Sequence, residues 1–182
     1  MKSPRTVLIG ILIATFVLTS IILIEIRNGF DIREAKAAPT GAHILYVGGS
    51  GNNNYTKLQD AINAASDGDT IKVYPSIHDG PIIINKELRL IGDPDIDGHG
   101  GIGIWVQTNN TLVENFTIYN CSTGIYVHNA SFILQNVTLY NNTIYNSTDG
   151  IKFRNVNDSR VYSSHIYNNS NNGVHLGSSS NN

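Results

Sequence analysis

Asn142-Thr-Ile-Tyr-Asn146 is a phrase that this chain repeats. It recurs with small changes as Phe116-Thr-Ile-Tyr-Asn120 and as Ser164-His-Ile-Tyr-Asn168. The isoleucines at the centre of the three copies are separated by 26 and then by 22 residues. A drifting period of this size is typical of a solenoid, in which each repeat is one coil stacked on the next.

A second phrase, a glycine followed by a short apolar strand pattern, alternates with the first. Its copies are Gly103–Val106, Gly124–Val127, Gly150–Phe153 and Gly173–Leu176. Apolar and polar residues alternate in both phrases, which indicates β-strands with one inward face. We therefore predict two or three short strands per coil, with Asn at turns because it tolerates left-handed backbone. The residues predicted to point inward are Ile118, Ile144, Ile166, Val127, Phe153 and Leu176.

The stretch before the repeats predicts a cap for the stack. Thr56-Lys-Leu-Gln59 matches a capping box, with Thr56 as N-cap and Gln59 three residues later. Leu58, Ala61, Ile62 and Ala65 then follow at helical spacing, and Ser66-Asp-Gly68 ends the helix. A short amphipathic helix of this kind would cover the open end of the sheets, whose backbone groups otherwise remain unpaired.

These residues resemble a known group of proteins. Leu58–Pro75 looks like the N-terminal cap and first coil of right-handed parallel β-helix proteins of the pectin-lyase-like superfamily, and Asn85–Gly92 looks like their next coil. The Asn-rich repeats are similar to those of the NosD-type branch. The resemblance implies an all-β, right-handed parallel β-helix with a short N-terminal capping α-helix, over residues 43–182. The last repeat breaks off near Asn182, so we expect a domain that is incomplete at its C-terminus.

The N-terminus predicts export. Lys2 and Arg5 precede an uncharged apolar run from Val7 to Ile24, long enough to span a bilayer as a helix. We assign residues 1–26 to a signal peptide or membrane-anchor helix and residues 27–42 to a linker. Ala35-Lys-Ala37 fits a cleavage signal but lies far from the apolar run, which favours an uncleaved anchor. The bulk of the chain is then expected at the cell surface, or secreted if the leader is cleaved.

Composition restricts the partners and the redox chemistry. Twelve Lys and Arg residues nearly balance 14 Asp and Glu residues, with no basic stripe, so we expect no nucleic-acid partner. The single cysteine, Cys121, cannot form an internal disulfide, and we interpret it as a buried filler residue. The expected partners are the membrane, through the N-terminal helix, and cell-surface polysaccharide or other surface proteins.

Metal binding is a secondary prediction, and we expect no cofactor. Asp93, Asp95 and Asp97, with Gly98, imitate the start of an EF-hand calcium loop, but Ile104 stands where the bidentate Glu belongs. A polar turn between coils is the simpler interpretation. The NosD resemblance raises copper, yet the histidines hold different repeat positions without a chelating spacing. They are His43, His78, His99, His128, His165 and His175.

Neither catalysis nor any catalytic residue is predicted from the repeats. Glycoside hydrolysis needs two carboxyl groups at a set separation. The acids after residue 101 are Glu114, Asp149 and Asp158, which hold different positions relative to the repeat isoleucines. Arg154 and Arg160 are interpreted as solvated.

Glycosylation has the densest signal in the sequence. Among ten N-x-[ST] patterns, the predicted acceptors at turns are Asn54, Asn109, Asn129 and Asn157.

The function favoured by the sequence is a non-enzymatic one. We expect an exported, membrane-anchored β-helix that serves as a structural or carbohydrate-interaction module. Tyrosines on the outer strand positions would stack on sugar rings: Tyr119, Tyr126, Tyr140, Tyr145, Tyr162 and Tyr167. Two alternatives stay open, a polysaccharide lyase or glycoside hydrolase whose catalytic coils lie outside this chain, and a NosD-like copper-handling accessory protein.

Overall fold

The structure of this protein is a computed structural model that describes residues 41–178. The helix predicted over residues 1–26 and nearly all of the linker lie outside the described residues. Within 41–178, no helix is long and apolar enough to cross a membrane.

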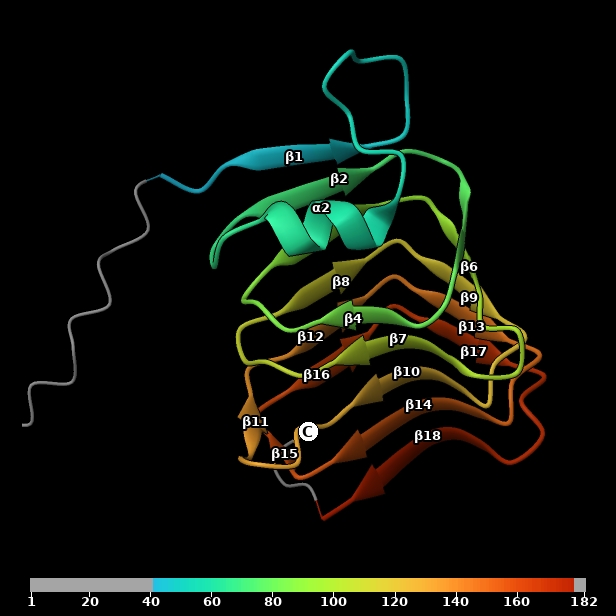
Figure 1. Ribbon diagram of the computed structural model, residues 1–182. Coiled ribbons are helices and arrows are strands. Elements are labelled where there is room, and N and C mark those ends of the chain that lie inside the picture. Colours follow the sequence, from blue (N-terminus) through green and yellow to red (C-terminus); the bar gives the residue numbers. More distant parts are fainter. Residues whose placement is uncertain (1–40, 179–182) are drawn as a thin grey trace, which may run out of the picture. The chain divides into compact units, whose positions relative to one another are not determined.

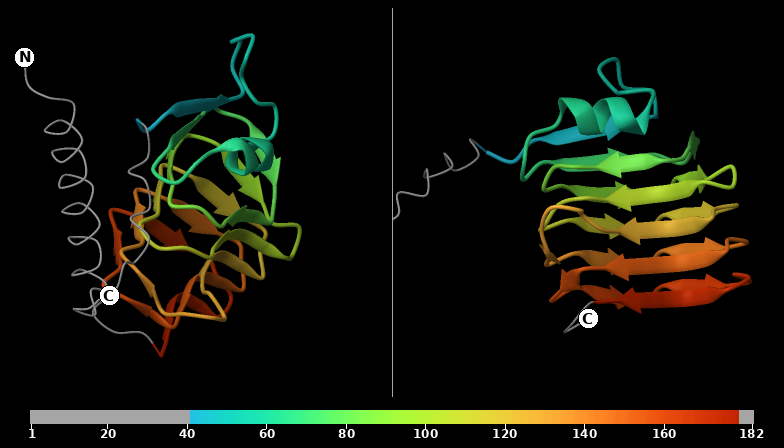
Figure 2. Two further views of the ribbon diagram at one scale, coloured as in Figure 1. Left: turned by 60° about the vertical axis from the view of Figure 1, so that its left-hand side comes forward. Right: turned by 60° about the horizontal axis from the view of Figure 1, so that its bottom comes forward.

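The described chain winds into a right-handed β-solenoid of about six turns, built from three parallel sheets (Figure 1). We call the six-stranded sheet A and the two five-stranded sheets B and C. Every pairing within them is parallel and joins one coil to the next. Figure 2 shows the coils stacked in order of sequence, with the helix at one end.

The strands are short, and those of one sheet recur once per coil. Sheet A contains β1 (Ile44–Val47), β2 (Thr70–Val73), β5 (Arg89–Gly92), β8 (Leu112–Glu114), β12 (Thr138–Tyr140) and β16 (Arg160–Tyr162). Sheet B contains β3 (Ile77–Asp79), β6 (Asp95–Asp97), β9 (Thr117–Tyr119), β13 (Thr143–Tyr145) and β17 (His165–Tyr167). Sheet C contains β4 (Ile82–Ile84), β7 (Ile102–Val106), β10 (Thr123–Val127), β14 (Asp149–Arg154) and β18 (Asn172–Gly177). The small strands β11 (Leu134–Gln135) and β15 (Val156–Asn157) pair with each other.

Columns of aliphatic side chains fill the inside of the coils. Ile96, Ile118 and Ile144 follow one another in register on sheet B, and each is fully buried. Val127 and Phe153 are neighbours on sheet C and are also buried, as predicted. Burying one such side chain contributes roughly 1.5–3 kcal/mol, so the repeating column is a main source of stability.

Ile166 and Leu176 also point inward, in register with Ile144 and Phe153, but the last coil leaves them partly exposed. Leu176 is 52 % exposed, and Ile166 is only partly buried. A residue in a solenoid is buried between the coils on its two sides, and within residues 41–178 strands β17 and β18 have a neighbour on one side only.

Asparagines form the corners between the strands, as predicted. Asn120, Asn146 and Asn168 have φ of 56°, 51° and 51°, which is left-handed backbone. Equivalent Asn side chains of adjacent coils bond to each other in neighbouring columns, where Asn141 Nδ2 donates to Asn115 Oδ1 over 2.6 Å. The amide of Asn120 instead donates to Asp97 Oδ1, at 2.9 Å.

Buried polar side chains close another set of corners. The Oδ1 atom of Asn142 accepts the backbone N–H of Phe116, and its Nδ2 donates to the carbonyl of Val113. Ser147 Oγ accepts the N–H of Cys121 in the same way, 26 residues earlier in the chain. Each such side chain satisfies a buried backbone group of the preceding coil, which fixes how the two coils stack.

The helix α2 (Leu58–Ala64) covers the first coils with Leu58, Ala61 and Ile62, as predicted. The predicted capping box is wrong, because the N-cap is Lys57 and no side chain caps it. The amide of Gln59 pairs instead with the backbone of Ile83 in β4, accepting its N–H at 2.8 Å and donating to its carbonyl at 3.1 Å. A bond from Gln59 to the stack fixes the helix on β4, which a capping box within the helix would not do.

Candidate functional site

Each sheet of the solenoid carries a column of outward-facing side chains, because alternate residues of a strand point to opposite faces. Each residue of such a column is paired in register with the equivalent residue of the next coil. Aromatic rings stack in these columns on all three sheets, and the partners are Tyr140 with Tyr162 on sheet A, Tyr119 with Tyr145 and Tyr145 with Tyr167 on sheet B, and Trp105 with Tyr126 on sheet C. The six tyrosines predicted to face outward are all partly or fully exposed.

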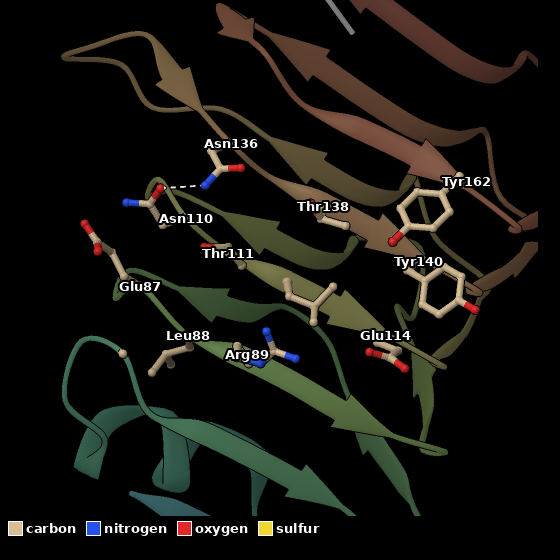
Figure 3. A pocket seen from close by; sticks show the side chains of 12 residues that line it. Glu87, Leu88, Arg89, Asn110, Thr111, Glu114, Asn136, Thr138, Tyr140 and Tyr162 are labelled. Atoms are coloured by element: carbon tan, nitrogen blue, oxygen red, sulfur yellow. Dashed lines mark hydrogen bonds between the residues drawn. The ribbon is translucent and has the colours of Figure 1, made fainter. Parts of the chain in front are cut away.

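A shallow hollow of about 560 Å³ lies over sheet A. Its floor is formed by β5, β8 and β12, and side chains of several coils project over it (Figure 3). In Figure 3 the rings of Tyr140 and Tyr162 stand at one end, beside Glu114. Glu87 lies at the opposite end, and Arg89 lies between the two carboxylates.

The tyrosine pair at the hollow is set by strand register. Glu114, Tyr140 and Tyr162 are successive members of one column on β8, β12 and β16. The ring centroids of the two tyrosines are 4.6 Å apart with planes inclined by 29°, and Tyr162 is 48 % exposed. The pair therefore offers a broad aromatic surface that is already fixed before any ligand binds.

Polar groups surround this aromatic surface. Arg89 and Thr138 belong to the next column of sheet A, and Arg89 is exposed. Asn136 Nδ2 donates to Asn110 Oδ1 over 2.8 Å at the edge of the hollow. Rings, a carboxylate, a guanidinium and amides together can stack on an apolar face and exchange hydrogen bonds with hydroxyl groups.

The comparison with protein families fits this architecture. The family model described as "Right handed beta helix region" matches residues 82–182, more than half of the chain. The chain belongs to this right-handed β-helix family. No curated protein and no solved structure matches it. The β-helix repeat domain is consistent with a structural or carbohydrate-interaction module.

The acids singled out in the sequence lie in different parts of the β-helix. Glu114 is at the hollow, Asp149 is buried in β14 on sheet C, and Asp158 lies at a corner with φ of 50°. Burial raises the pKa of Asp149, but amide donors of Asn172 and Asn171 outweigh it, so the pKa lies below its ordinary value. Asp149 thus joins two coils of the β-helix. Arg154 and Arg160 are exposed, as predicted.

The residues of the predicted calcium loop are placed differently. Asp95 and Asp97 lie in strand β6 and point outward, while Asp93 lies just before it. An extended strand spaces these carboxylates along the sheet, whereas an EF-hand loop folds its ligands around one ion. In residues 41–178, no three His, Cys, Asp or Glu side chains are grouped so that they could hold a metal ion.

One feature of this region was missed from the sequence. His99 Nε2 lies 2.7 Å from Asp79 Oδ1, and its backbone N–H donates to Asp97 Oδ1. The bond to Asp79, followed by the charge of Asp97, raises the pKa of His99, and the backbone bond from His99 lowers the pKa of Asp97. The cluster joins the coils of β3 and β6.

The other histidines proposed for copper lie on separate parts of the β-helix. His43 lies 3.6 Å from Asp69 beside the first coil, and His78 lies in register with the inward Ile96. His165 lies on sheet B, while His128 and His175 lie on or beside sheet C.

The predicted glycosylation acceptors are all partly buried. The Nδ2 atoms of Asn54 and Asn129, to which a glycan would be linked, donate to the carbonyls of Gly48 and Gln107. Asn109 Oδ1 accepts the N–H of Gln135, and Asn157 lies in β15. A glycosylated Nδ2 keeps one hydrogen, so these bonds do not decide attachment, and occupancy of the four sites stays a prediction.

Tyr140 and Tyr162 were predicted to face outward, but their common column with Glu114 was not, although the sequence marks it. Tyr140 and Tyr162 each precede a repeat isoleucine by four residues, as Glu114 does. Residues at the same distance before a repeat isoleucine lie in one column, so this shared spacing predicts the column.

Proposed function

We propose that this protein binds polysaccharide through the hollow on sheet A, as a non-catalytic carbohydrate-interaction module. The observation that carries the proposal is the open, stacked pair of Tyr140 and Tyr162 in one column with Glu114. A pair of rings held in place by the sheet loses little conformational freedom on binding, so it suits recognition of a flat, partly apolar sugar face.

The surrounding polar groups would orient the sugar. Its hydroxyls would donate to Glu114 and accept from Arg89 or from the second amide hydrogen of Asn136. The hollow is shallow and open, so it suits one stretch of a long polymer rather than an enclosed small molecule. Affinity for one copy would be modest.

Localisation and the finer family assignment are part of the same proposal. The protein is exported and displayed at the cell surface on an N-terminal anchor, as a glycosylated member of the NosD-type branch of the pectin-lyase-like superfamily. The uncharged run Val7–Ile24 after Lys2 and Arg5 supports the anchor, and the Asn-rich repeats support the branch. Membrane fractionation with protease treatment of intact cells tests display, and a mass shift after deglycosylation tests the glycans.

Electrophoresis of the full chain through gels that contain neutral or acidic polysaccharides tests the ligand class. We expect retardation by at least one polysaccharide, and a loss of affinity of about two- to tenfold in Tyr140→Ala and in Tyr162→Ala. Tyr167→Ala is the matched control, since Tyr167 is 47 % exposed and stacked but lies on sheet B. The proposal fails if no polysaccharide retards the protein, or if the control loses as much affinity as the two variants.

A further inference from the structure

The outward columns of sheets B and C carry opposite charges. Acidic side chains gather on sheet B, where Asp79 and Asp97 are successive members of one column and Asp95 lies beside them. Cationic side chains lie on sheet C, where β14 carries Lys152 and the exposed Arg154, and the polar His175 follows Lys152 in its column. The two sheets belong to the same coils, so each copy of the protein presents both faces.

The order of residues along the two columns is reversed. From the first coil to the last, the sheet B column contains Asp79, Asp97, Tyr119, Tyr145 and Tyr167. The sheet C column, over the same five coils, contains Ile83, Trp105, Tyr126, Lys152 and His175. One column runs from acids to aromatic rings, and the other from apolar and aromatic residues to Lys152 and the polar His175.

We propose that sheet B of one copy packs side by side against sheet C of a second copy, with the coil stacks antiparallel. Both columns have one residue per strand at a spacing of about 4.8 Å, so they match coil for coil. In the antiparallel arrangement Asp97 faces Lys152, and Asp79 faces His175. The rings of Tyr119 and Tyr145 then face those of Tyr126 and Trp105. A parallel arrangement would place Lys152 opposite Tyr145 and pair no charges.

The local charges leave this complementarity intact. His99 contacts both Asp79 and Asp97, but one imidazolium neutralises at most one of the carboxylates of this face. On sheet C the acid within the strands is Asp149, which is buried and accepts bonds from Asn171 and Asn172. Arg154, which is exposed, adds a further cation beyond Lys152.

The aromatic rings of both columns are already stacked within each copy. The rings of Tyr119 and Tyr145 have centroids 5.5 Å apart, and those of Trp105 and Tyr126 are 5.9 Å apart. Trp105 Nε1 donates to the carbonyl of His128, which fixes the indole on the sheet. Such rings are enriched in interface cores, while the charges set the direction of approach.

The expected contact is small and repeats. Five strands extend over only about 19 Å, so one contact is smaller than the roughly 800 Å² per partner of a stable interface. The association is therefore weak and sensitive to salt. Because sheet B meets sheet C, the contact is heterologous and each copy keeps a free face, which favours open rows of alternating orientation.

Sedimentation of the full chain in a non-ionic detergent, at rising protein concentration and at low and high salt, tests the association. We expect reversible association at low salt that weakens at high salt. Asp97→Lys and Lys152→Glu should each weaken it about tenfold, and the double variant should restore it, because the charge pair is re-formed with reversed sign. Lys72→Glu, a charge change at an exposed site on sheet A, is the matched control and should change nothing.

Asp97→Asn separates the loss of charge from a loss of folding, because the Oδ1 of the new asparagine can still accept hydrogen bonds from His99 and Asn120. This variant should also weaken association. Carbodiimide treatment of a mixture of isotopically light and heavy chains should join Asp97 of one chain to Lys152 of another. A protein that stays monomeric at every concentration overturns the proposal. Association that Asp97→Asn leaves unchanged also overturns it. If Leu176→Asp alone abolishes association, the copies stack through the last coil instead, and the proposal is wrong.

Discussion

Replacing Asn142 by Leu removes a side chain that connects two coils of the β-helix. The side chain of Asn142 has no exposed surface. Its Oδ1 lies 2.9 Å from the backbone nitrogen of Phe116, and its Nδ2 lies 3.0 Å from the carbonyl oxygen of Val113. Leucine has a similar volume but neither donates nor accepts, so the substitution leaves the N–H of Phe116 buried without its partner. It also removes one hydrogen bond from the carbonyl of Val113, which lies in the ladder between β8 and β12.

The expected loss of stability follows from those two groups. A buried donor left without a partner costs about 1–3 kcal/mol and one lost hydrogen bond about 1 kcal/mol, so Asn142→Leu should lower the free energy of unfolding by roughly 2–4 kcal/mol. Asn142→Ser should cost about half as much, because its hydroxyl can accept from Phe116 while the bond to Val113 is lost. Ser164 Oγ already accepts the N–H of Asn142 in this manner.

Urea unfolding of the full chain, followed by circular dichroism, measures these differences. Both the midpoint and the slope should be compared, since a solenoid need not unfold in one step. Thr143→Val is the matched control, because Thr143 is the next residue and faces outward on sheet B; it should change stability by less than about 0.5 kcal/mol. The reasoning is refuted if Asn142→Leu lies within that limit, or if the Ser and Leu variants are equally unstable.

Three further predictions concern the cap helix, the loss of stability at acidic pH and the thiol of Cys121. Lys86 Nζ donates to three carbonyls at the end of α2, so Lys86→Met should destabilise the protein by about 1–3 kcal/mol in urea unfolding, with exposed Lys72→Met as control. Burial raises the pKa of Asp69, but the hydrogen bonds from the N–H groups of Ser66 and His43 together outweigh burial. The pKa therefore lies below the ordinary value of 3.8. The ionised carboxylate therefore stabilises the fold above that value and its contribution is lost as the pH falls below it, so Asp69→Asn should flatten the acid side of a plot of urea midpoint against pH. Cys121 is buried, and burial raises the pKa of its thiol. Because a disulfide reagent reaches the thiol only when the protein opens, the thiol should react at neutral pH only as fast as the protein unfolds.

Each of the three has a result that contradicts it. Equal midpoints for Lys86→Met and the control would mean that the helix end is satisfied by water. An unchanged pH profile in Asp69→Asn would mean that the carboxylate bonds to Ser66 and His43 add nothing. Rapid labelling of Cys121 in the native protein would show that its coil opens readily.

Much of the fold could be predicted because a solenoid is encoded locally. Ile118 and Ile144 are recognised from the repeated phrase itself, and the Asn corners follow from the tolerance of Asn for left-handed backbone. The cap helix was predicted from the spacing of Leu58, Ala61 and Ile62. Leu176 points inward as predicted, but its exposure could not be predicted, because the pattern of one coil says nothing about which coils lie beside it.

The site was harder to predict, because its members come from different coils. Glu114 differs in residue type from Tyr140 and Tyr162, which hold the same place in their repeats, so a pattern of one residue type does not connect the three. The pairing of His99 with Asp79 joins residues 20 positions apart, a separation that no local motif marks.

The sequence by itself determined the coil, its inward column and its Asn turns, since these depend on residues a few positions apart. Only the tertiary structure decided what one coil does for the next. It places Gln59 against Ile83 instead of within a capping box, sets Asn142 against the backbone of the preceding coil, and aligns the outward columns of the three sheets. The reason is that successive coils differ in length, as the spacings of 26 and 22 residues show, so the alignment of side chains across coils is fixed by parallel strand pairing.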